Sequence, residues 1–499
     1  MMGASIRFLL GNEVQELSGF DPQMTVLEWL RTHARRTGTK EGCAEGDCGA
    51  CTVAVGEPGP QGVRYRAFNS CIQLLPTLDG KQLLTVEDLA GSGSDADGLH
   101  PVQQAMVDQH GSQCGFCTPG FVMSLFTLYH ADGVEIHRQR IDQAIAGNLC
   151  RCTGYAPIVR AAVQAMETAP GDGFHRDRGQ LATQLRQLRR EKSLHLEYRG
   201  RHYHAPVSLA EVWQLLQQYP QARMVAGATD VGLWITKELR IFDRLINLCN
   251  VPELLRLEKD QAAGHLTVGA AVNYSDALEV LTQCYPGMGE MLLRLGAEQV
   301  RNAGTIGGNI ANGSPIGDMP PTLIALDARL VLSSAAGARE IALEDFFLGY
   351  GRQDLRPGEC VECIRVPLLQ SGLRFAVYKV AKRFDQDISA LCGAFCIRLE
   401  NEQVQEARIC FGGMAGIPSR ARAAEQALLG QAWNEQTLRR AQAALALDYT
   451  PLTDWRASRE YRALAAQNLL QRFYLQNSSP GSSGELSHQP WRLAGGKPG

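Results

Sequence analysis

The first part of the chain alternates between apolar and polar residues in short runs. Four such runs are residues 5–10 and 13–17, separated by Gly11-Asn12, and residues 52–55 and 63–68, separated by a turn-rich segment. A period of two predicts strands with one buried face, and Gly-Asn between two of them predicts a hairpin. Residues 25–34 have apolar positions at helical spacing instead, so we expect a small sheet crossed by one helix.

Both periodicities recur in the rest of the chain. Helical spacing is found in residues 121–130, 158–166, 424–430 and 435–446, and strand-like runs are found in residues 373–380, 394–400 and 406–413. Elements of both kinds in separate blocks predict a multidomain α+β protein. Residues 168–193 are polar, with turn residues at their start, which predicts a linker with one exposed helix. The basic half of this segment could contact nucleic acid, but a solvated linker face is the simpler interpretation.

Composition narrows the class of protein. The chain has 499 residues, of which 45% are hydrophobic and 20% are charged, with a formal net charge of -3. These values are typical of a globular protein with two to four domains and do not favour nucleic-acid binding. The N-terminus shows no cleavable signal pattern, and no stretch approaches the roughly 18 apolar residues of a membrane span. We therefore expect a cytoplasmic protein without membrane contact. In a reducing compartment structural disulfides are rare, so the clusters among its fifteen cysteines indicate metal or redox chemistry.

The first cysteine group consists of Cys43, Cys48, Cys51 and Cys71. Its C-x4-C-x2-C spacing, with a fourth cysteine downstream, is the plant-type ferredoxin pattern in which four thiolates hold a 2Fe-2S cluster. Gly42, Gly46 and Gly49 can take positive φ angles and bring backbone N–H groups close to the sulfurs. Zinc is the alternative, but zinc ligands usually come as two separate pairs rather than three in one loop.

The second cysteine group consists of Cys114, Cys117, Cys150 and Cys152. Each pair precedes a helical pattern: Thr118 is the expected cap of the first helix, with Pro119 at its first position, and Pro157 opens the other helix in the same way. The N–H groups and positive dipole end of a helix N-terminus favour thiolates and a net-negative cluster. A zinc site with a C-x-C pair would be unusual.

Two glycine-containing loops follow, in residues 224–234 and 300–321. Such loops expose backbone N–H groups that can surround a pyrophosphate, although ordinary surface loops would have the same pattern. Neither loop contains the G-x-G-x-x-G of a Rossmann fold.

Cys360 and Cys363 form a further C-x2-C without a second pair, so we expect them to be ordinary packing residues. No histidine falls in a triad or a zinc signature, and we expect the histidines to be scattered over the surface.

The motifs CAEGDCGAC, QCGFCTPGF and GNLCRCTGY, together with Cys71, closely resemble the two iron–sulfur domains of the molybdenum hydroxylase family, to which xanthine dehydrogenase belongs. The eight cysteines match the ligands of that family one by one. The resemblance implies a β-grasp ferredoxin-like domain and a helical bundle domain, each with a 2Fe-2S cluster. Gln113 matches a family position near molybdopterin, which implies that the second cluster faces the molybdenum centre.

The same resemblance extends to the FAD domain of this family. It implies FAD contacts in a first loop of Met224, Val225, Ala226, Gly227, Ala228, Thr229, Asp230 and Val231, in a second loop of Thr305, Ile306, Gly307, Gly308 and Asn309, and at Asp318, Val361 and Lys379. Asp318 matches an acidic contact, Val361 an apolar contact and Lys379 the flavin-side lysine. Leu295 stands where some relatives have an aromatic ring beside the isoalloxazine.

The resemblance also divides the chain. The expected parts are a ferredoxin-like 2Fe-2S domain (1–90), a helical 2Fe-2S domain (91–168), a linker (169–196), an FAD-binding domain (197–371), a C-terminal flavoprotein domain (372–479) and a disordered tail (480–499).

The function implied by the resemblance is electron transfer in the small subunit of a xanthine dehydrogenase. Hypoxanthine and xanthine would be hydroxylated at a molybdopterin centre in a large partner subunit. This chain would therefore supply no catalytic residue. Electrons would pass through the Cys114 cluster, the Cys43 cluster and FAD to NAD, in a heterotetramer of two small and two large subunits. The alternatives are the equivalent subunit of a hydroxylase for an aldehyde or N-heterocycle, and a free-standing electron carrier.

Overall fold

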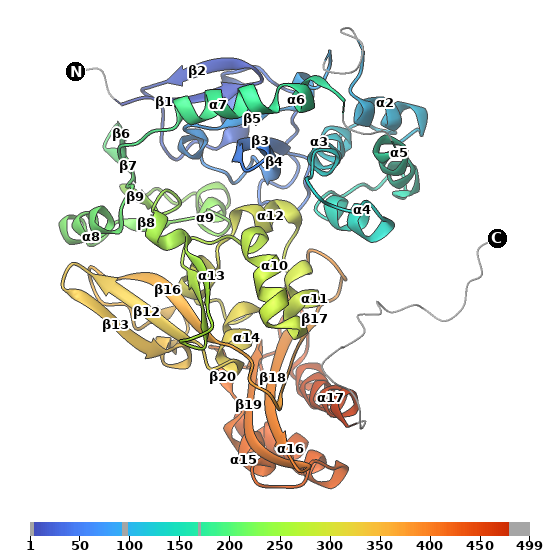
Figure 1. Ribbon diagram of the computed structural model, residues 1–499, viewed down its shortest axis with the longest axis vertical. Helices are drawn as coiled ribbons and strands as arrows, with labels where there is room; N and C mark the ends of the chain where they lie inside the picture. Colours follow the sequence, from blue (N-terminus) through green and yellow to red (C-terminus); the bar gives the residue numbers. More distant parts are fainter. Residues whose placement is uncertain (1–3, 92–97, 168–170, 479–499) are drawn as a thin grey trace.

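The computed structural model describes residues 4–91, 98–167 and 171–478, so the tail expected to be disordered lies outside the described residues. Figure 1 shows the chain passing from an N-terminal sheet at the top of the view to the C-terminal helices at the bottom. One helical domain lies between domains that contain sheets, which confirms the predicted multidomain α+β class. Within these ranges, none of the helices combines the length and the apolar character needed to cross a bilayer.

The N-terminal domain is a five-stranded sheet of order β2-β1-β5-β3-β4. Its strands are β1 (Ile6–Leu10), β2 (Glu13–Leu17), β3 (Thr52–Gly59), β4 (Gly62–Asn69) and β5 (Gln82–Leu84). The predicted hairpin is confirmed, because β1 pairs with β2 in antiparallel register across Gly11, whose φ is +59°. Helix α1 (Val26–Thr32) is capped by Thr25 and packs Trp29 against Phe8, with ring centroids 5.3 Å apart.

Four helices form the next domain: α2 (Pro101–Asp108), α3 (Thr118–Tyr129), α4 (Arg138–Ile145) and α5 (Ala156–Met166). Helix α3 is its centre, since nearly all of its residues are buried. We expected Thr118 to cap α3, but the cap is Cys117, and Thr118 is the first helical residue. The residue that caps the helix is therefore a cysteine of the second group.

The segment after α5 is more than a linker. It contains α6 (Gly173–Arg176) and α7 (Arg178–Leu188). Helix α7 was expected to be exposed, but it buries Leu181, Ala182, Leu185 and Leu188 in the core shared by the ferredoxin-like sheet and the helical domain. Figure 1 shows it lying along the N-terminal sheet. The apolar spacing on one face of α7 explains this packing.

The following domain contains two larger sheets, a two-stranded sheet of β14 and β15, and several helices. The first sheet has the order β6-β7-β9-β8, with β6 (Leu194–Tyr198), β7 (Arg201–Ala205), β8 (Arg223–Val225) and β9 (Arg244–Asn247). The second has the order β10-β11-β16-β12-β13, with β10 (Leu257–Asp260), β11 (His265–Gly269), β12 (Arg329–Ser334), β13 (Gly337–Ala342) and β16 (Cys360–Pro367). The other elements are α8 (Leu209–Gln218), α9 (Val231–Thr236), α10 (Tyr274–Cys284), α11 (Gly289–Leu293), α12 (Glu298–Ala303), α13 (Ile306–Asn312), α14 (Met319–Ala325), β14 (Phe347–Gly349) and β15 (Arg352–Gln353).

The C-terminal domain is a four-stranded sheet covered by helices. It contains β17 (Leu373–Val380), β18 (Leu391–Glu400), β19 (Gln403–Gly412), β20 (Ser419–Arg420), α15 (Arg422–Leu428), α16 (Glu435–Asp448) and α17 (Arg459–Asn477). One hydrophobic core extends from the second sheet of the preceding domain into this sheet. Cys360 and Cys363 are free, buried thiols, which confirms their expected role in packing.

Candidate functional site

The first cysteine group gathers in one place. Cys43, Cys48 and Cys51 lie in the loop between α1 and β3, and Cys71 follows β4. The Cys43 sulfur accepts backbone N–H groups of Glu45, Asp47 and Cys48 at 3.3–3.4 Å. Cys51 and Cys71 are buried at 1% and 3% exposure. The backbone donors around the partly buried Cys43 sulfur stabilise its thiolate, as an anionic cluster requires.

The spacing of the sulfurs distinguishes one metal ion from two. Cys43 interacts with Cys48 and Cys71, and Cys51 interacts with Cys71. In the described part of the chain, no three cysteine sulfurs lie within 4.8 Å of one another. Four thiolates at about 2.3 Å from a single zinc would be only about 3.8 Å apart. The arrangement therefore fits a dinuclear cluster better than zinc.

The second cysteine group is arranged in two pairs at helix ends. Cys114 interacts with Cys152, and Cys117 interacts with Cys150. The Cys150 backbone N–H donates to the Tyr155 hydroxyl at 2.9 Å, and Tyr155 itself caps α5 with a φ of 68°. Two thiol pairs again suit two metal ions.

Solvent exposure separates this second group from the first. Cys114 and Cys152 are exposed, and so are the neighbouring side chains of Phe116 and Leu149. Burial raises the pKa of the Cys117 thiol to about 12. Burial also raises the pKa of Cys150, but hydrogen bonds with Thr153 outweigh it and leave that pKa below its ordinary value. One side of the second group thus faces the surface.

The two glycine-containing loops meet between β8 and α13. A Cβ on Gly227 would lie 1.8 Å from the carbonyl oxygen of Ala303, so only glycine allows the first loop to approach the second this closely. The Thr305 hydroxyl caps α13 by accepting the Gly308 N–H at 3.0 Å. Gly307 is equally confined, because its Cβ would lie 2.5 Å from the Cα of Ala270. The loops expected to bind FAD therefore form one surface.

Three polar side chains meet beside these loops. The Lys379 ammonium donates to Asp318 and to Ser389, each at 2.7 Å, and the Ser389 hydroxyl donates to the other Asp318 oxygen at 2.5 Å. All three residues are buried. Sequence reasoning identified Asp318 and Lys379 but missed Ser389, since a lone serine in a loop carries no motif.

The remaining expected FAD residues lie around the same loops. Val361, on β16, belongs to the hydrophobic core that contains Ile306 of the second loop. Leu295 is partly buried against this core. Because it is a leucine, this position offers no aromatic ring. The Asn309 side-chain oxygen is buried without a hydrogen-bond partner. A glycine-lined helix N-terminus fits a phosphate group, and the unpaired Asn309 oxygen, which is an acceptor, fits a hydroxyl or N–H donor; FAD carries both kinds of group.

The first cysteine loop lies against the region of the FAD loops. The Thr236 hydroxyl at the end of α9 donates to the carbonyl of Ala44 at 2.9 Å. Gln386 donates through its side chain to the carbonyl of Asp47. In addition, Val225 and Val231 of the first FAD loop share a hydrophobic core with residues of the ferredoxin-like domain. The first cysteine site and the expected FAD site are therefore packed together rather than tethered.

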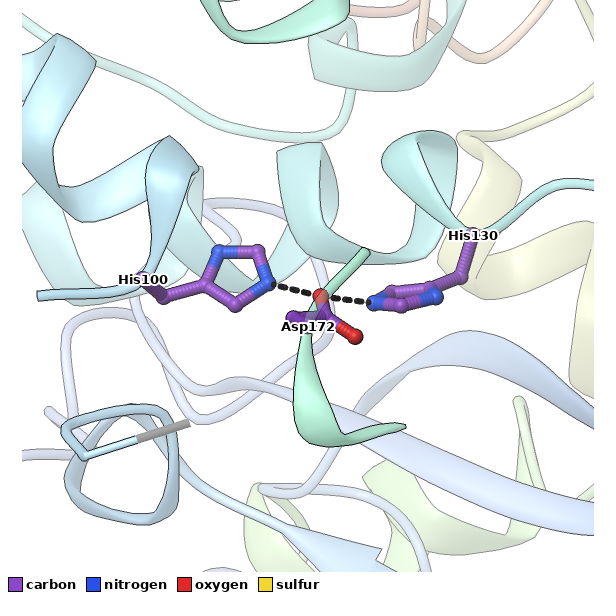
Figure 2. Close-up of side chains that lie close together, drawn as sticks. All are labelled: His100, His130 and Asp172. Carbon is purple, nitrogen blue, oxygen red and sulfur yellow. Dashed lines mark hydrogen bonds and ion pairs between the residues drawn. The ribbon is translucent and has the colours of Figure 1, made fainter. Parts of the chain in front are cut away.

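A buried group of histidines was missed by the sequence reasoning. His100 and His130 are not on the surface, as expected, but are fully buried on either side of Asp172 (Figure 2). Their Nε2 atoms lie 2.8 Å and 2.9 Å from the same Asp172 oxygen. The Asp172 carboxylate also caps α6 by accepting the His175 N–H at 2.8 Å. The group fastens the segment after α5 to the N-terminus of α2 and to the C-terminus of α3.

The protonation of His100 argues against a metal ion in this group. His100 caps α2, and its Nδ1 atom accepts the Val102 N–H at 3.2 Å. The proton of a neutral His100 must therefore be on Nε2, where it is donated to Asp172. An Nε2 atom that carries a proton cannot coordinate a metal. We interpret the group as a hydrogen-bonded clamp.

The chain matches four domain families. These are the 2Fe-2S iron-sulfur cluster binding domain (residues 12–72), the 2Fe-2S binding domain (85–163), the FAD binding domain in molybdopterin dehydrogenase (196–369) and the CO dehydrogenase flavoprotein C-terminal domain (376–477). Two iron–sulfur domains followed by an FAD-binding domain define an electron-transferring oxidoreductase.

Similar full-length proteins and solved structures define the class of oxidoreductase more closely. Xanthine dehydrogenase 1 of Arabidopsis thaliana is 32% identical over 83% of the chain, and xanthine dehydrogenase/oxidase of Gallus gallus is 29% identical over 94%. The chain spans 35% and 39% of the lengths of these two relatives.

Among solved structures, a carbon monoxide dehydrogenase of Hydrogenophaga pseudoflava is 30% identical with a TM-score of 0.52, covering 54% of this chain and 94% of that one. A quinoline 2-oxidoreductase of Pseudomonas putida 86 is 29% identical with a TM-score of 0.51, covering 55% and 95%. The chain belongs to the molybdenum hydroxylase family.

Proposed function

We propose that this chain is the electron-transfer subunit of a xanthine dehydrogenase. In this proposal the first cysteine group (Cys43, Cys48, Cys51 and Cys71) and the second (Cys114, Cys117, Cys150 and Cys152) each hold one 2Fe-2S cluster. The loops at 224–231 and 305–309, with Asp318, Val361 and Lys379, hold FAD. The expected domain boundaries belong to the same proposal.

The position of the first cysteine loop carries the proposal. On one side its Cys48 carbonyl accepts the N–H of Leu149, the neighbour of Cys150, at 3.0 Å. On the other side its Ala44 carbonyl is bonded to Thr236, at the end of α9. The order second group, first group, FAD loops is the order in which electrons would travel. FAD, when bound, exchanges single electrons with iron–sulfur centres and a hydride with a nicotinamide, which supports NAD as the final acceptor.

The residues of this chain have distinct tasks in this scheme. The Cys43 loop supplies backbone N–H donors that would hold the partly buried Cys43 sulfur as a thiolate. Asp318 keeps the Lys379 ammonium in place beside the FAD loops, because a buried cation requires a partner. The exposed face around Phe116 supports a large molybdopterin-binding partner, in a heterotetramer of two small and two large subunits. All fifteen cysteines are free, which supports a cytoplasmic location.

A second candidate is favoured by the similarity to quinoline 2-oxidoreductase. Its level of identity, 29%, equals that of the Gallus gallus relative. Hydroxylation of an N-heterocycle or an aldehyde would use the same electron path, because the substrate would bind in the partner. A free-standing electron carrier would need no such partner.

The test begins with the purified chain. We expect two 2Fe-2S centres and one FAD, together with NADH oxidation by an artificial dye but no xanthine turnover. Zinc without iron after anaerobic purification would contradict the cluster assignment. The complex purified with its molybdopterin subunit is then assayed with xanthine, quinoline and an aldehyde, each with NAD and with oxygen. Turnover of quinoline but not xanthine would favour the second candidate, and a chain without any molybdopterin partner would favour the free carrier.

A further inference from the structure

Three glycines hold the two cysteine loops together. They are Gly49, beside Cys48, Gly120, in the first turn of α3, and Gly147, shortly before Cys150. A Cβ on Gly49 would lie 2.1 Å from the carbonyl oxygen of Gly147, and a Cβ on Gly120 would lie 2.2 Å from that of Gly49. We call this contact the glycine seam. Any side chain in it would force the two loops apart by about 1.3 Å or more, because contacts of 2.1–2.2 Å would have to open to at least about 3.5 Å.

Direct hydrogen bonds cross the seam. The Leu149 N–H donates to the Cys48 carbonyl at 3.0 Å. The Asn148 amide donates to the Gly49 carbonyl at 3.1 Å. Cys48 and Cys150 are therefore joined by one hydrogen bond and a few backbone bonds, although they are far apart in the sequence.

Gln299, on α12 of the FAD-binding domain, lies at the edge of the seam. It is 1% exposed, and its amide is 3.2 Å from acceptor oxygens of Thr52, Ser124 and Asn148. These three residues come from the ferredoxin-like sheet and from the helical domain. A Cβ on Gly147 would lie 2.1 Å from the Gln299 side-chain oxygen. One side chain thus joins all three cofactor domains at a single buried point.

We propose that the glycine seam and Gln299 are positioning residues that set the separation of the two cysteine sites. This inference rests on the proposed function, since it concerns the distance between two clusters. Electronic and magnetic coupling between two centres both fall steeply with their separation. A contact that only glycine permits keeps this separation at the minimum that the two backbones allow.

The test compares Gly120→Ala with Gly179→Ala in the whole chain. Gly120 has no positive φ, so alanine suits its backbone and changes only the space at the seam. Gly179 also lies in a helix, but nothing is within 4 Å of its missing Cβ, which makes it the matched control. Iron and FAD are measured first, and the magnetic interaction of the two reduced clusters is then measured by electron paramagnetic resonance.

We expect full iron in both variants, a narrower spin–spin splitting in Gly120→Ala, and a still narrower one in Gly120→Ser. The Gly179→Ala splitting should equal that of the parent. An unchanged splitting in Gly120→Ala with full iron would overturn the inference alone. A parent chain without iron would overturn the proposed function and the inference with it.

If Gly120→Ala does not retain its iron, Gln299→Leu decides the question. This substitution keeps the side-chain volume and removes the amide that bonds Thr52, Ser124 and Asn148. We expect a narrower splitting and faster hydrogen exchange at the Leu149 amide, whose bond to Cys48 crosses the seam. Parental values of both quantities would overturn the inference, since a merely space-filling role for Gln299 would change neither.

Discussion

The two cysteine sites have the same number of thiols but opposite surroundings. The first is the more deeply buried, with two of its cysteines nearly inaccessible and its loop in contact with two other domains. The second lies at the ends of two helices, with Cys114 and Cys152 open to solvent. Burial suits a site that exchanges electrons only within the chain, whereas exposure suits a site that must face another centre. The difference predicts that a substitution in the first site also affects stability and FAD binding, whereas a substitution in the second site affects only its own cluster.

Removing one cysteine from each site would have the largest effect. Cys51 lies in a small core with Leu27, Cys71 and Ile72, so Cys51→Ser should remove the first cluster and also lower thermal stability and FAD content. Cys152→Ser should remove about half of the iron and leave FAD and the fold intact. Iron, sulfide, FAD and thermal unfolding are measured for both. The comparison would fail if Cys152→Ser lost its FAD while folded, or if Cys51→Ser kept both stability and FAD.

The clamp around Asp172 should make the domain of the second site depend on one carboxylate. Asp172→Ala leaves the buried His100 imidazole without its acceptor and removes the close contact of Asp172 with His130, at a cost of about 2–5 kcal/mol in the free energy of unfolding. Asp142→Ala, which breaks an exposed ion pair with Arg138 in the same domain, should cost at most about 0.5 kcal/mol. Denaturant unfolding measures both. Equal effects would mean that the clamp adds nothing to an ordinary surface ion pair.

Acid should weaken the clamp, because the group contains a buried histidine and a buried carboxylate. Burial lowers the pKa of His130 below 6.5, so the unfolded chain binds a proton that the folded chain does not, and stability falls as the pH drops below about 6.5. Burial raises the pKa of Asp172, but hydrogen bonds from His100 and His130 outweigh it and hold that pKa below its ordinary value. Its contribution is therefore present above the unfolded pKa of about 3.9 and is lost as the pH falls through the folded value.

The pH dependence is checked by unfolding between pH 7.5 and pH 5. We expect a loss of up to about 2 kcal/mol in the parent and a flatter curve in His130→Phe, which keeps a ring in the same space. Tyr65 and Arg178 also influence this group, and neither titrates in this range. A parental slope in His130→Phe would assign the acid sensitivity to other groups.

The smallest effect concerns the exposed side of the second site. Phe116→Ser should change the unfolding free energy of the isolated chain by no more than about 0.5 kcal/mol, because the ring is 48% exposed. It should weaken binding to the molybdopterin subunit by about 1–2 kcal/mol, roughly fivefold to thirtyfold. Leu447→Ser, at a side chain 82% exposed on α16, is the control and should bind normally. Equal binding of both variants would contradict the prediction that the partner binds to this face.

Several features of the sites follow from local sequence. The spacing of Cys43, Cys48 and Cys51 predicts a common site because the short loop that contains them cannot carry them far apart. The prolines in the first turns of α3 and α5 predict where these helices begin, to within the one residue by which Cys117 replaces Thr118 as the cap of α3. The hairpin around Gly11 follows for the same reason, since alternation and a turn residue act over a few positions.

The tertiary structure decided how these local pieces face one another. The glycine seam joins Gly49 to Gly147, Gln299 reaches Thr52 across 247 residues of sequence, and the clamp joins His100 to Asp172 across 72. Hydrophobic periodicity predicts that a face is buried but carries no information about which partner buries it. The sequence by itself therefore determined which cysteines group together, and only the packing of the domains decided that one group is covered by other domains and the other is open to solvent.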